Sequence, residues 1–218
     1  MGFLLGIDEA GKGPVIGPLV IAGVLISEEN EGKLKKLGIK DSKELSPEKR
    51  KKFSEEIKNL SEDFVVLKIS ARELNKEMDT KTLNEIEIGR IAQIINSFWM
   101  KRPKVYIDAL EANTKKFKEK ILSRLKDKKI EIIAKNNADK TYPVVSAASI
   151  IAKVTRDSEI KNLHKKYGFF GSGYPSDERT IEFLEKLDRE VYNKIVRLKW
   201  ETSKNILKNK KQRKLLEF

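Results

Sequence analysis

Short apolar runs separated by charged or glycine-rich stretches recur along the chain, a pattern typical of folds in which strands and helices alternate. Residues 3–7, 15–26 and 64–69 are apolar runs of the kind that form strands, and glycine-rich residues separate the first two. Residues 46–60 begin with a serine–proline pair, which favours a helix because serine caps the first turn and proline fits its first position. The pattern predicts two joined strands, a helix and a third strand.

Strands and helices continue to alternate through the rest of the chain. Residues 104–108 and 130–134 predict strands, and apolar residues spaced three or four apart over residues 82–98 predict an amphipathic helix. Further helices are predicted over residues 117–125, over 144–167, and from about Thr180 and about Lys194. This order favours an α/β fold, a mixed β-sheet flanked by helices. We expect a core over residues 1–168 and a C-terminal helical segment over residues 169–218.

The composition indicates a globular protein with a heavily charged surface, because 39% of the 218 residues are hydrophobic and 36% are charged. No apolar run approaches the roughly 20 residues that a membrane-spanning helix requires. The first residues have no basic flank and meet Asp8 too early to form a signal peptide. Cysteine is absent, which excludes disulfides and is consistent with a reducing compartment. We therefore expect a cytoplasmic protein that does not bind a membrane.

The formal net charge of +13 favours partners with many phosphates, or an anionic membrane surface. The alternative is a lysine-rich surface that is simply well solvated. Charge alone therefore suggests a nucleic-acid partner without identifying a nuclease.

Several carboxylates follow apolar runs, where an ionised group is costly unless it has a partner. Asp8 and Glu9 close the first strand, Asp108 ends the strand at 104–108, and Asp139 lies between the last predicted strand and the long helix. Carboxylates gathered at strand ends repel one another, and divalent cations relieve that repulsion. The alternative is that these acids begin or cap turns, and spacing alone does not decide between the two.

A metal site built from these acids would use hard oxygen ligands, which favour Mg²⁺ or Mn²⁺ over Zn²⁺. Two such ions can activate a water and stabilise the leaving oxygen in phosphodiester hydrolysis. Asp8 and Glu9 are neighbours on a strand, and neighbours point to opposite faces. They can share a site only if the strand bends or ends there, and the glycines at positions 11 and 13 favour such a bend.

The residues around the carboxylates resemble the motifs of ribonuclease HII (type 2 ribonuclease H), in its archaeal form. The matches follow the family's order and cover nearly the whole chain: 6–18 (GIDEAGKGPVIGP), 40–46 (KDSKELS), 106–108 (YID), 138–139 with 142–157 (AD, YPVVSAASIIAKVTRD), 171–177 (GSGYPSD) and 200–202 (WET). One motif alone would be weak, but the ordered set is specific.

The resemblance implies a ribonuclease H-like mixed sheet and a C-terminal helical segment that forms one side of the substrate groove. It also implies a set of catalytic, metal-binding carboxylates that hold two divalent ions, Mg²⁺ or Mn²⁺: Asp8, Glu9, Asp108 and Asp139. The chain departs from the family at Lys12, where arginine is usual, and lysine loses the two-pronged phosphate contact. It also has Asn136 and Asn137 before the Ala-Asp pair, where histidine or lysine is usual.

The resemblance further implies substrate contacts. Gly11, Lys12 and Gly13 match the tripeptide that recognises the ribose 2′-hydroxyl, which distinguishes RNA from DNA. Glycines suit this role because they let backbone groups approach closely. Tyr174 matches the aromatic residue that packs on the next sugar. The candidate phosphate contacts are Lys43, Ser146 and Ser149.

The last residues fit the spacing Gln-x-x-Leu-x-x-Phe at Gln212, Leu215 and Phe218. This spacing resembles a short peptide whose apolar residues fill a groove on the sliding clamp. The second aromatic residue of that peptide is missing here, and a frayed basic tail is the alternative.

The expected function is a metal-dependent endonuclease that hydrolyses the RNA strand of RNA–DNA hybrids. It would also cut 5′ of ribonucleotides embedded in duplex DNA, leaving a 3′-hydroxyl and a 5′-phosphate. Two alternatives stay open: a non-catalytic module that binds hybrids, and a DNA nuclease of the same fold. The signature begins at Asp8, which favours ribonuclease HII over the type HIII enzymes with their N-terminal domain, and the family expectation is a monomer.

Overall fold

The computed structural model describes residues 2–39 and 45–216, apart from the side chains of residues 211 and 213–216. A five-stranded sheet has the order β3-β2-β1-β4-β5. Strand β1 pairs antiparallel with β2 and parallel with β4, and β4 pairs parallel with β5. The mixed sheet predicted from the sequence is therefore confirmed. Its strands are β1 (Phe3–Ala10), β2 (Leu19–Ser27), β3 (Asp63–Ile69), β4 (Lys104–Asp108) and β5 (Ile132–Lys135).

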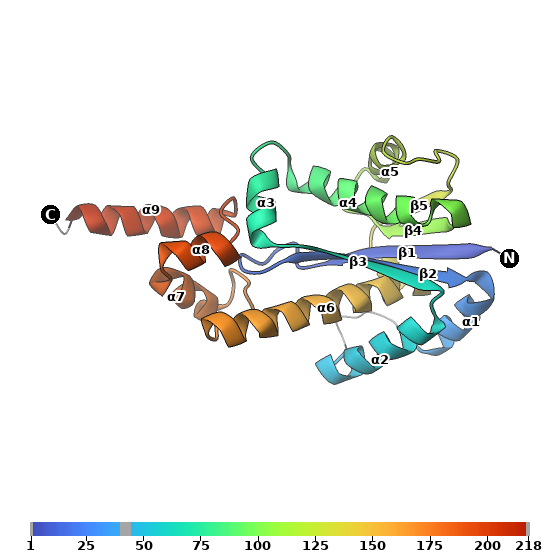
Figure 1. Ribbon diagram of the computed structural model, residues 1–218, viewed down its shortest axis with the longest axis horizontal. Helices are drawn as coiled ribbons and strands as arrows, with labels where there is room; N and C mark the ends of the chain where they lie inside the picture. Colours follow the sequence, from blue (N-terminus) through green and yellow to red (C-terminus); the bar gives the residue numbers. More distant parts are fainter. Residues whose placement is uncertain (1, 40–44, 217–218) are drawn as a thin grey trace. The chain divides into compact units, whose positions relative to one another are not determined.

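Helices cover both faces of this sheet. Helices α4 and α5 lie on one face, whereas α1, α2 and the start of α6 lie on the other (Figure 1). The helices are α1 (Glu28–Lys36), α2 (Pro47–Leu60), α3 (Ala71–Glu77), α4 (Leu83–Ser97), α5 (Thr114–Leu122), α6 (Pro143–Tyr167), α7 (Glu178–Lys186), α8 (Arg189–Ile195) and α9 (Glu201–Leu216), with 3₁₀ turns η1 (Trp99–Lys101) and η2 (Ala138–Lys140).

The chain forms two compact units whose segments interleave in sequence. The first unit contains Met1–Ala10, Val20–Leu67 and Asn84–Thr155, and the second contains Gly11–Leu19, Lys68–Leu83 and Arg156–Phe218. Each unit has its own core: apolar residues of β1, β2, α1, α2 and the start of α6 pack together in the first, and apolar residues of the last four helices with Val15 and Ile16 pack together in the second. The domain boundary expected at residue 168 stays a prediction.

Glycines allow helices to lie very close to the sheet of the first unit. A Cβ atom on Gly6 of β1 would lie 2.1 Å from the backbone oxygen of Val144, at the start of α6. On β2, a Cβ atom on Gly23 would lie 2.3 Å from Cγ2 of Ile94 in α4. Real Cβ contacts are never this short, so each helix occupies space that any other residue would fill. The close approach at Gly6 places the start of α6 against β1.

Several sequence predictions are confirmed at the level of individual caps. The Ser46 side chain accepts a hydrogen bond from the Lys49 N–H and begins α2, with proline in the first turn. Helix α6 ends before Gly168, which has a φ of +90°. Such a conformation strains every residue except glycine.

Two predictions on element boundaries were wrong. The second strand begins at Leu19 rather than Val15, because Gly17 has a φ of +92° and Ile16 forms an isolated bridge with Val196 instead. Lys194 lies within α8, and α9 begins at Glu201. Within the described part of the chain, no helix is both long and apolar enough to cross a membrane.

Candidate active site

Asp8 and Asp108 follow directly after paired residues of neighbouring parallel strands in the first unit. The last pair recorded between β1 and β4 is Ile7 with Ile107. Adjacent strands lie about 5 Å apart. Asp8 is buried, with 6% of its surface exposed. The parallel register therefore places two carboxylates side by side at one edge of the sheet.

A tight turn brings a third carboxylate to the same place. After β5, Asn137 adopts a left-handed conformation with a φ of 56°, and the chain enters the turn η2. The N–H of Ala138 then donates to Oδ1 of Asp108 at 2.9 Å. Asp139, the next residue, is 5% exposed. Asp8, Asp108 and Asp139 are called the carboxylate cluster below.

Backbone N–H groups hold one oxygen of each carboxylate in the cluster. Oδ1 of Asp8 accepts from the Glu9 N–H at 2.7 Å, and Oδ1 of Asp139 accepts from the Lys140 N–H at 3.0 Å. Oδ1 of Asp108 accepts from Ala138, as described. These bonds fix the orientation of each side chain without supplying a full positive charge to balance it.

Burial and negative neighbours raise the pKa of Asp8 to about 7. Burial has the larger effect, and the charges of Asp108 and Asp139 act in the same direction, whereas a hydrogen bond from Ser149 lowers the pKa. The ionised form of Asp8 is therefore poorly compensated by the protein itself. A divalent cation would supply the missing positive charge, so this donor set fits Mg²⁺ or Mn²⁺.

Glu9 stands differently from the cluster. Strand β1 continues in regular register through Glu9, which pairs with Ile21, to Ala10, so the expected bend or end at residues 8 and 9 is absent from the strand. Neighbours on a regular strand point to opposite faces. Among the described residues, no three Asp, Glu or His side chains are grouped as ligands for one ion. The set of four metal ligands stays a prediction.

The candidate phosphate contacts lie beside the cluster as far as they are described. Ser149 donates to Asp8, and Ser146 donates to the backbone oxygen of Asp139. Ser146 also lines a cavity of about 300 Å³ together with Lys35 and Lys140. Their roles as phosphate contacts stay predictions, and Lys43 lies outside the described residues.

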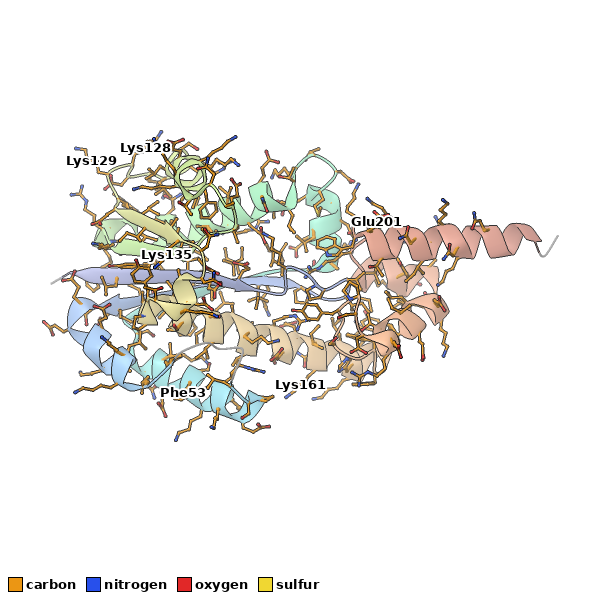
Figure 2. The ribbon with its side chains drawn as sticks, turned by 180° about the vertical axis from the view of Figure 1, so that it is seen from behind. Phe53, Lys128, Lys129, Lys135, Lys161 and Glu201 are labelled. Carbon is orange, nitrogen blue, oxygen red and sulfur yellow. The ribbon has the colours of Figure 1, made fainter. Side chains whose placement is uncertain are left out.

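Several exposed lysines of this unit provide attraction for a phosphate backbone. Figure 2 shows Lys128 and Lys129 projecting from the segment between α5 and β5. Lys135, at the end of β5, and Lys140, beside Asp139, are also exposed. Such surface cations favour binding to any nucleic acid and give no sequence preference.

The second unit contains the tripeptide Gly11–Gly13, called the glycine turn below. Gly11 has a φ of +89°, and a Cβ atom there would lie 2.8 Å from the backbone oxygen of Pro18. Only glycine fits this position. Gly13 is exposed, and a Cβ atom on it would lie 3.5 Å from Cε1 of Tyr174. The glycine turn and Tyr174, separated by 160 residues of sequence, therefore lie together.

Arg156, a residue for which the sequence motifs predicted no role, holds the loop that bears Tyr174. Its guanidinium lies 5.2 Å from the centre of the Tyr174 ring, and Nη2 donates to the backbone oxygen of Ser172 at 3.0 Å. Burial lowers the pKa of Arg156, but arginine stays charged at neutral pH. Tyr174 itself is 36% exposed, so part of its side chain is open to solvent.

Comparisons with known proteins agree on one family. A sequence model described as Ribonuclease HII matches residues 5–203. The chain is 44% identical over 211 residues to a ribonuclease HII of Pyrococcus furiosus, covering 96% of this chain and 93% of that protein.

Solved structures show the same similarity. The crystal structure of ribonuclease H2 from Pyrococcus horikoshii OT3 has a TM-score of 0.84 at 41% identity, covering 95% of this chain and 98% of that one. The PCNA:RNase HII complex from Archaeoglobus fulgidus gives a TM-score of 0.81 at 42% identity, covering 91% of this chain and 95% of that one.

Proposed function

The chain belongs to the ribonuclease HII family, endonucleases that degrade the RNA of RNA–DNA hybrids, and we propose that the carboxylate cluster is its catalytic centre. Glu9 completes the proposed set of ligands, as the family pattern implies. The observation that supports this proposal best is geometric: the parallel pairing of β1 with β4 and the turn η2 bring two buried acids, Asp8 and Asp139, beside Asp108. Acids gathered in a buried site repel one another, and bound cations relieve that repulsion.

The family depends on divalent metal ions, and we propose two of them, Mg²⁺ or Mn²⁺, held by Asp8, Asp108, Asp139 and Glu9. When bound, they would activate water and neutralise charge on the phosphate. The chain's own part is to fix the oxygens: the backbone N–H groups of Glu9, Ala138 and Lys140 orient the three aspartates. Because β1 is regular, Glu9 would have to reach an ion on its own side of the strand.

Recognition of the ribose is proposed for the second unit. Backbone groups of the glycine turn would bind the 2′-hydroxyl, and Tyr174 would pack against the next sugar. Lys12 supplies a positive charge for the adjacent phosphate, but as a single point rather than a planar fork. The helical segment from residue 169 is proposed to form one side of the substrate groove. The cytoplasm stays the predicted compartment.

Cleavage of a DNA duplex that contains one ribonucleotide tests the proposal. We expect a cut 5′ of the ribonucleotide in Mg²⁺ or Mn²⁺, with 3′-hydroxyl and 5′-phosphate ends, and none in EDTA. An all-DNA duplex of the same sequence is the control and should stay intact. Binding without cleavage in either metal would favour a non-catalytic module, and cleavage of the all-DNA duplex would favour a DNA nuclease.

We also propose that the C-terminal peptide binds a sliding clamp through Gln212, Leu215 and Phe218. A related protein has been solved in complex with PCNA. In this chain Gln212 is exposed on α9, whereas Phe218 and the side chain of Leu215 lie outside the described residues.

Replacing both apolar residues, Leu215→Ala with Phe218→Ala, should weaken binding to purified PCNA at least about tenfold, because such peptides bind through a few buried side chains. Surface plasmon resonance measures the effect. Lys208→Ala, an exposed position on the same helix, is the control and should bind nearly as the parent does. Equal affinity of the double variant and the parent would refute the assignment.

A further inference from the structure

A fully buried arginine binds the backbone of the glycine turn. Arg197 follows α8, is 0% exposed, and belongs to the second unit, as does the turn. Its guanidinium donates to three backbone oxygens: Nη2 to Gly11 at 2.7 Å, Nη1 to Lys12 at 3.0 Å, and Nε to Gly17 at 3.0 Å. One planar side chain therefore holds both ends of the loop that contains the turn.

The segment that bears Arg197 is itself fixed on both sides. The Asn75 side chain donates to the Val196 oxygen and accepts from the Leu198 N–H, both at 2.8 Å. The backbone N–H of Arg197 donates to Val15 at 2.9 Å. Its backbone oxygen accepts from the Ser203 hydroxyl at 2.8 Å. The guanidinium thus acts from a rigid support.

The geometry of the peptide bond then determines where the turn's own donors point. In a trans peptide the carbonyl and the following N–H lie in one plane and point in opposite directions. Because Arg197 binds the oxygens of Gly11 and Lys12, the N–H groups of Lys12 and Gly13 point away from the guanidinium. Gly13 is exposed and Lys12 is partly exposed. Those two N–H groups are the donors that a bound hydroxyl could meet.

We propose that Arg197 is a positioning residue for ribose recognition: it orients the N–H groups of Lys12 and Gly13 toward the 2′-hydroxyl. The inference rests on the proposed role of the glycine turn. The competing role is purely structural, since a buried arginine that loses its partners destabilises any fold. A structural role would lower stability without changing the preference for ribose over deoxyribose.

The ratio of two dissociation constants separates these roles. In a protein inactivated by Asp108→Asn, affinity is measured in Mg²⁺ for a duplex with one ribonucleotide and for the matched all-DNA duplex. Arg197→Gln, which replaces five N–H donors on three nitrogens by two on a single nitrogen, should reduce the preference for the ribonucleotide about tenfold. Arg197→Lys keeps the charge and should show a preference between that of the parent and that of the glutamine variant. If the glutamine variant does not fold, the lysine variant is compared with the parent, and a folded Arg197→Lys protein with the parent's full preference would overturn the inference.

Ser203→Ala is the matched control, because it removes a bond to the Arg197 backbone and leaves the guanidinium contacts in place. It should lower the melting temperature and keep the preference. A folded Arg197→Gln protein with the parent's preference would overturn the inference. A parent with no preference for the ribonucleotide would instead overturn the proposed role of the turn.

Discussion

The Asp8→Asn variant is expected to lose cleavage almost completely while the metal-free protein becomes more stable than its parent. An amide keeps the shape of the carboxylate but cannot supply its charge to a divalent ion. Loss of such a ligand should lower kcat by about a thousandfold or more. Activity and stability therefore change in opposite directions.

The stability gain follows from the direction of the pKa shift. The pKa of Asp8 in the folded protein is about 7, above its ordinary value of 3.8. Between these values the folded state binds a proton that the unfolded state has lost, so the free energy of unfolding falls as the pH rises toward 7. Asparagine has no such penalty. At pH 8 in EDTA, the variant's melting temperature should exceed the parent's by about 3 °C or more.

Melting curves in EDTA at pH 5 and pH 8, with cleavage rates in Mg²⁺, measure both effects. Asp63→Asn is a matched control, because Oδ1 of Asp63 also accepts the next backbone N–H at 2.7 Å but the residue is exposed. It should change neither quantity appreciably. Full activity of the Asp8→Asn protein would exclude Asp8 as a ligand.

Gly6→Ala should disrupt both the fold and the site, although residue 6 bears no functional group. The new Cβ atom would meet backbone atoms of Val144 at 2.1 and 2.3 Å and of Val145 at 2.7 Å. These atoms begin α6 and cannot rotate away, so the helix must shift as a body. We expect a loss of about 3 kcal/mol in the free energy of unfolding. Cleavage should fall at least about tenfold, since α6 bears Ser149, which donates to Asp8.

Urea unfolding and cleavage rates at saturating substrate test this expectation. Gly89→Ala in α4 is the control, because a Cβ atom there would meet nothing within 4 Å. Alanine in a helix is favoured over glycine by about 0.5–1 kcal/mol, so this variant should be slightly stabilised and fully active. A Gly6→Ala protein as stable as the parent would show that α6 can move at little cost.

The sheet and the long helices could be predicted because their apolar patterns repeat over many residues. Short elements were harder to predict. Helix α3 has a capping box between Ser70 and Glu73 that is visible in the sequence, yet its seven residues give too little periodicity to stand out. Helix α8 begins at an Asp188 cap, whereas the start predicted from the sequence was at about Lys194.

Some features of the candidate site could likewise be predicted from the sequence, and others could not. Asp8 and Asp108 lie together because β1 and β4 are neighbouring parallel strands whose last recorded pair is Ile7 with Ile107. The role of Arg197 could not be predicted, since its partner Gly11 is 186 residues away and nothing in the flanking sequence marks it. The orientation of Glu9 depends on whether β1 bends. The glycines at positions 11 and 13 predicted a bend, but β1 pairs regularly through Ala10.

The distance along the chain between Arg197 and the glycine turn has a consequence for the nascent protein. Every residue of the carboxylate cluster, and Ser149 with it, has been synthesised when about two thirds of the chain has been made. The turn at residues 11–13 is among the first segments made, yet the arginine that binds its carbonyl oxygens, Arg197, is synthesised near the end of the chain. Contacts of such long sequence separation form late. An emerging chain thus acquires its acids before it acquires an ordered turn to recognise ribose.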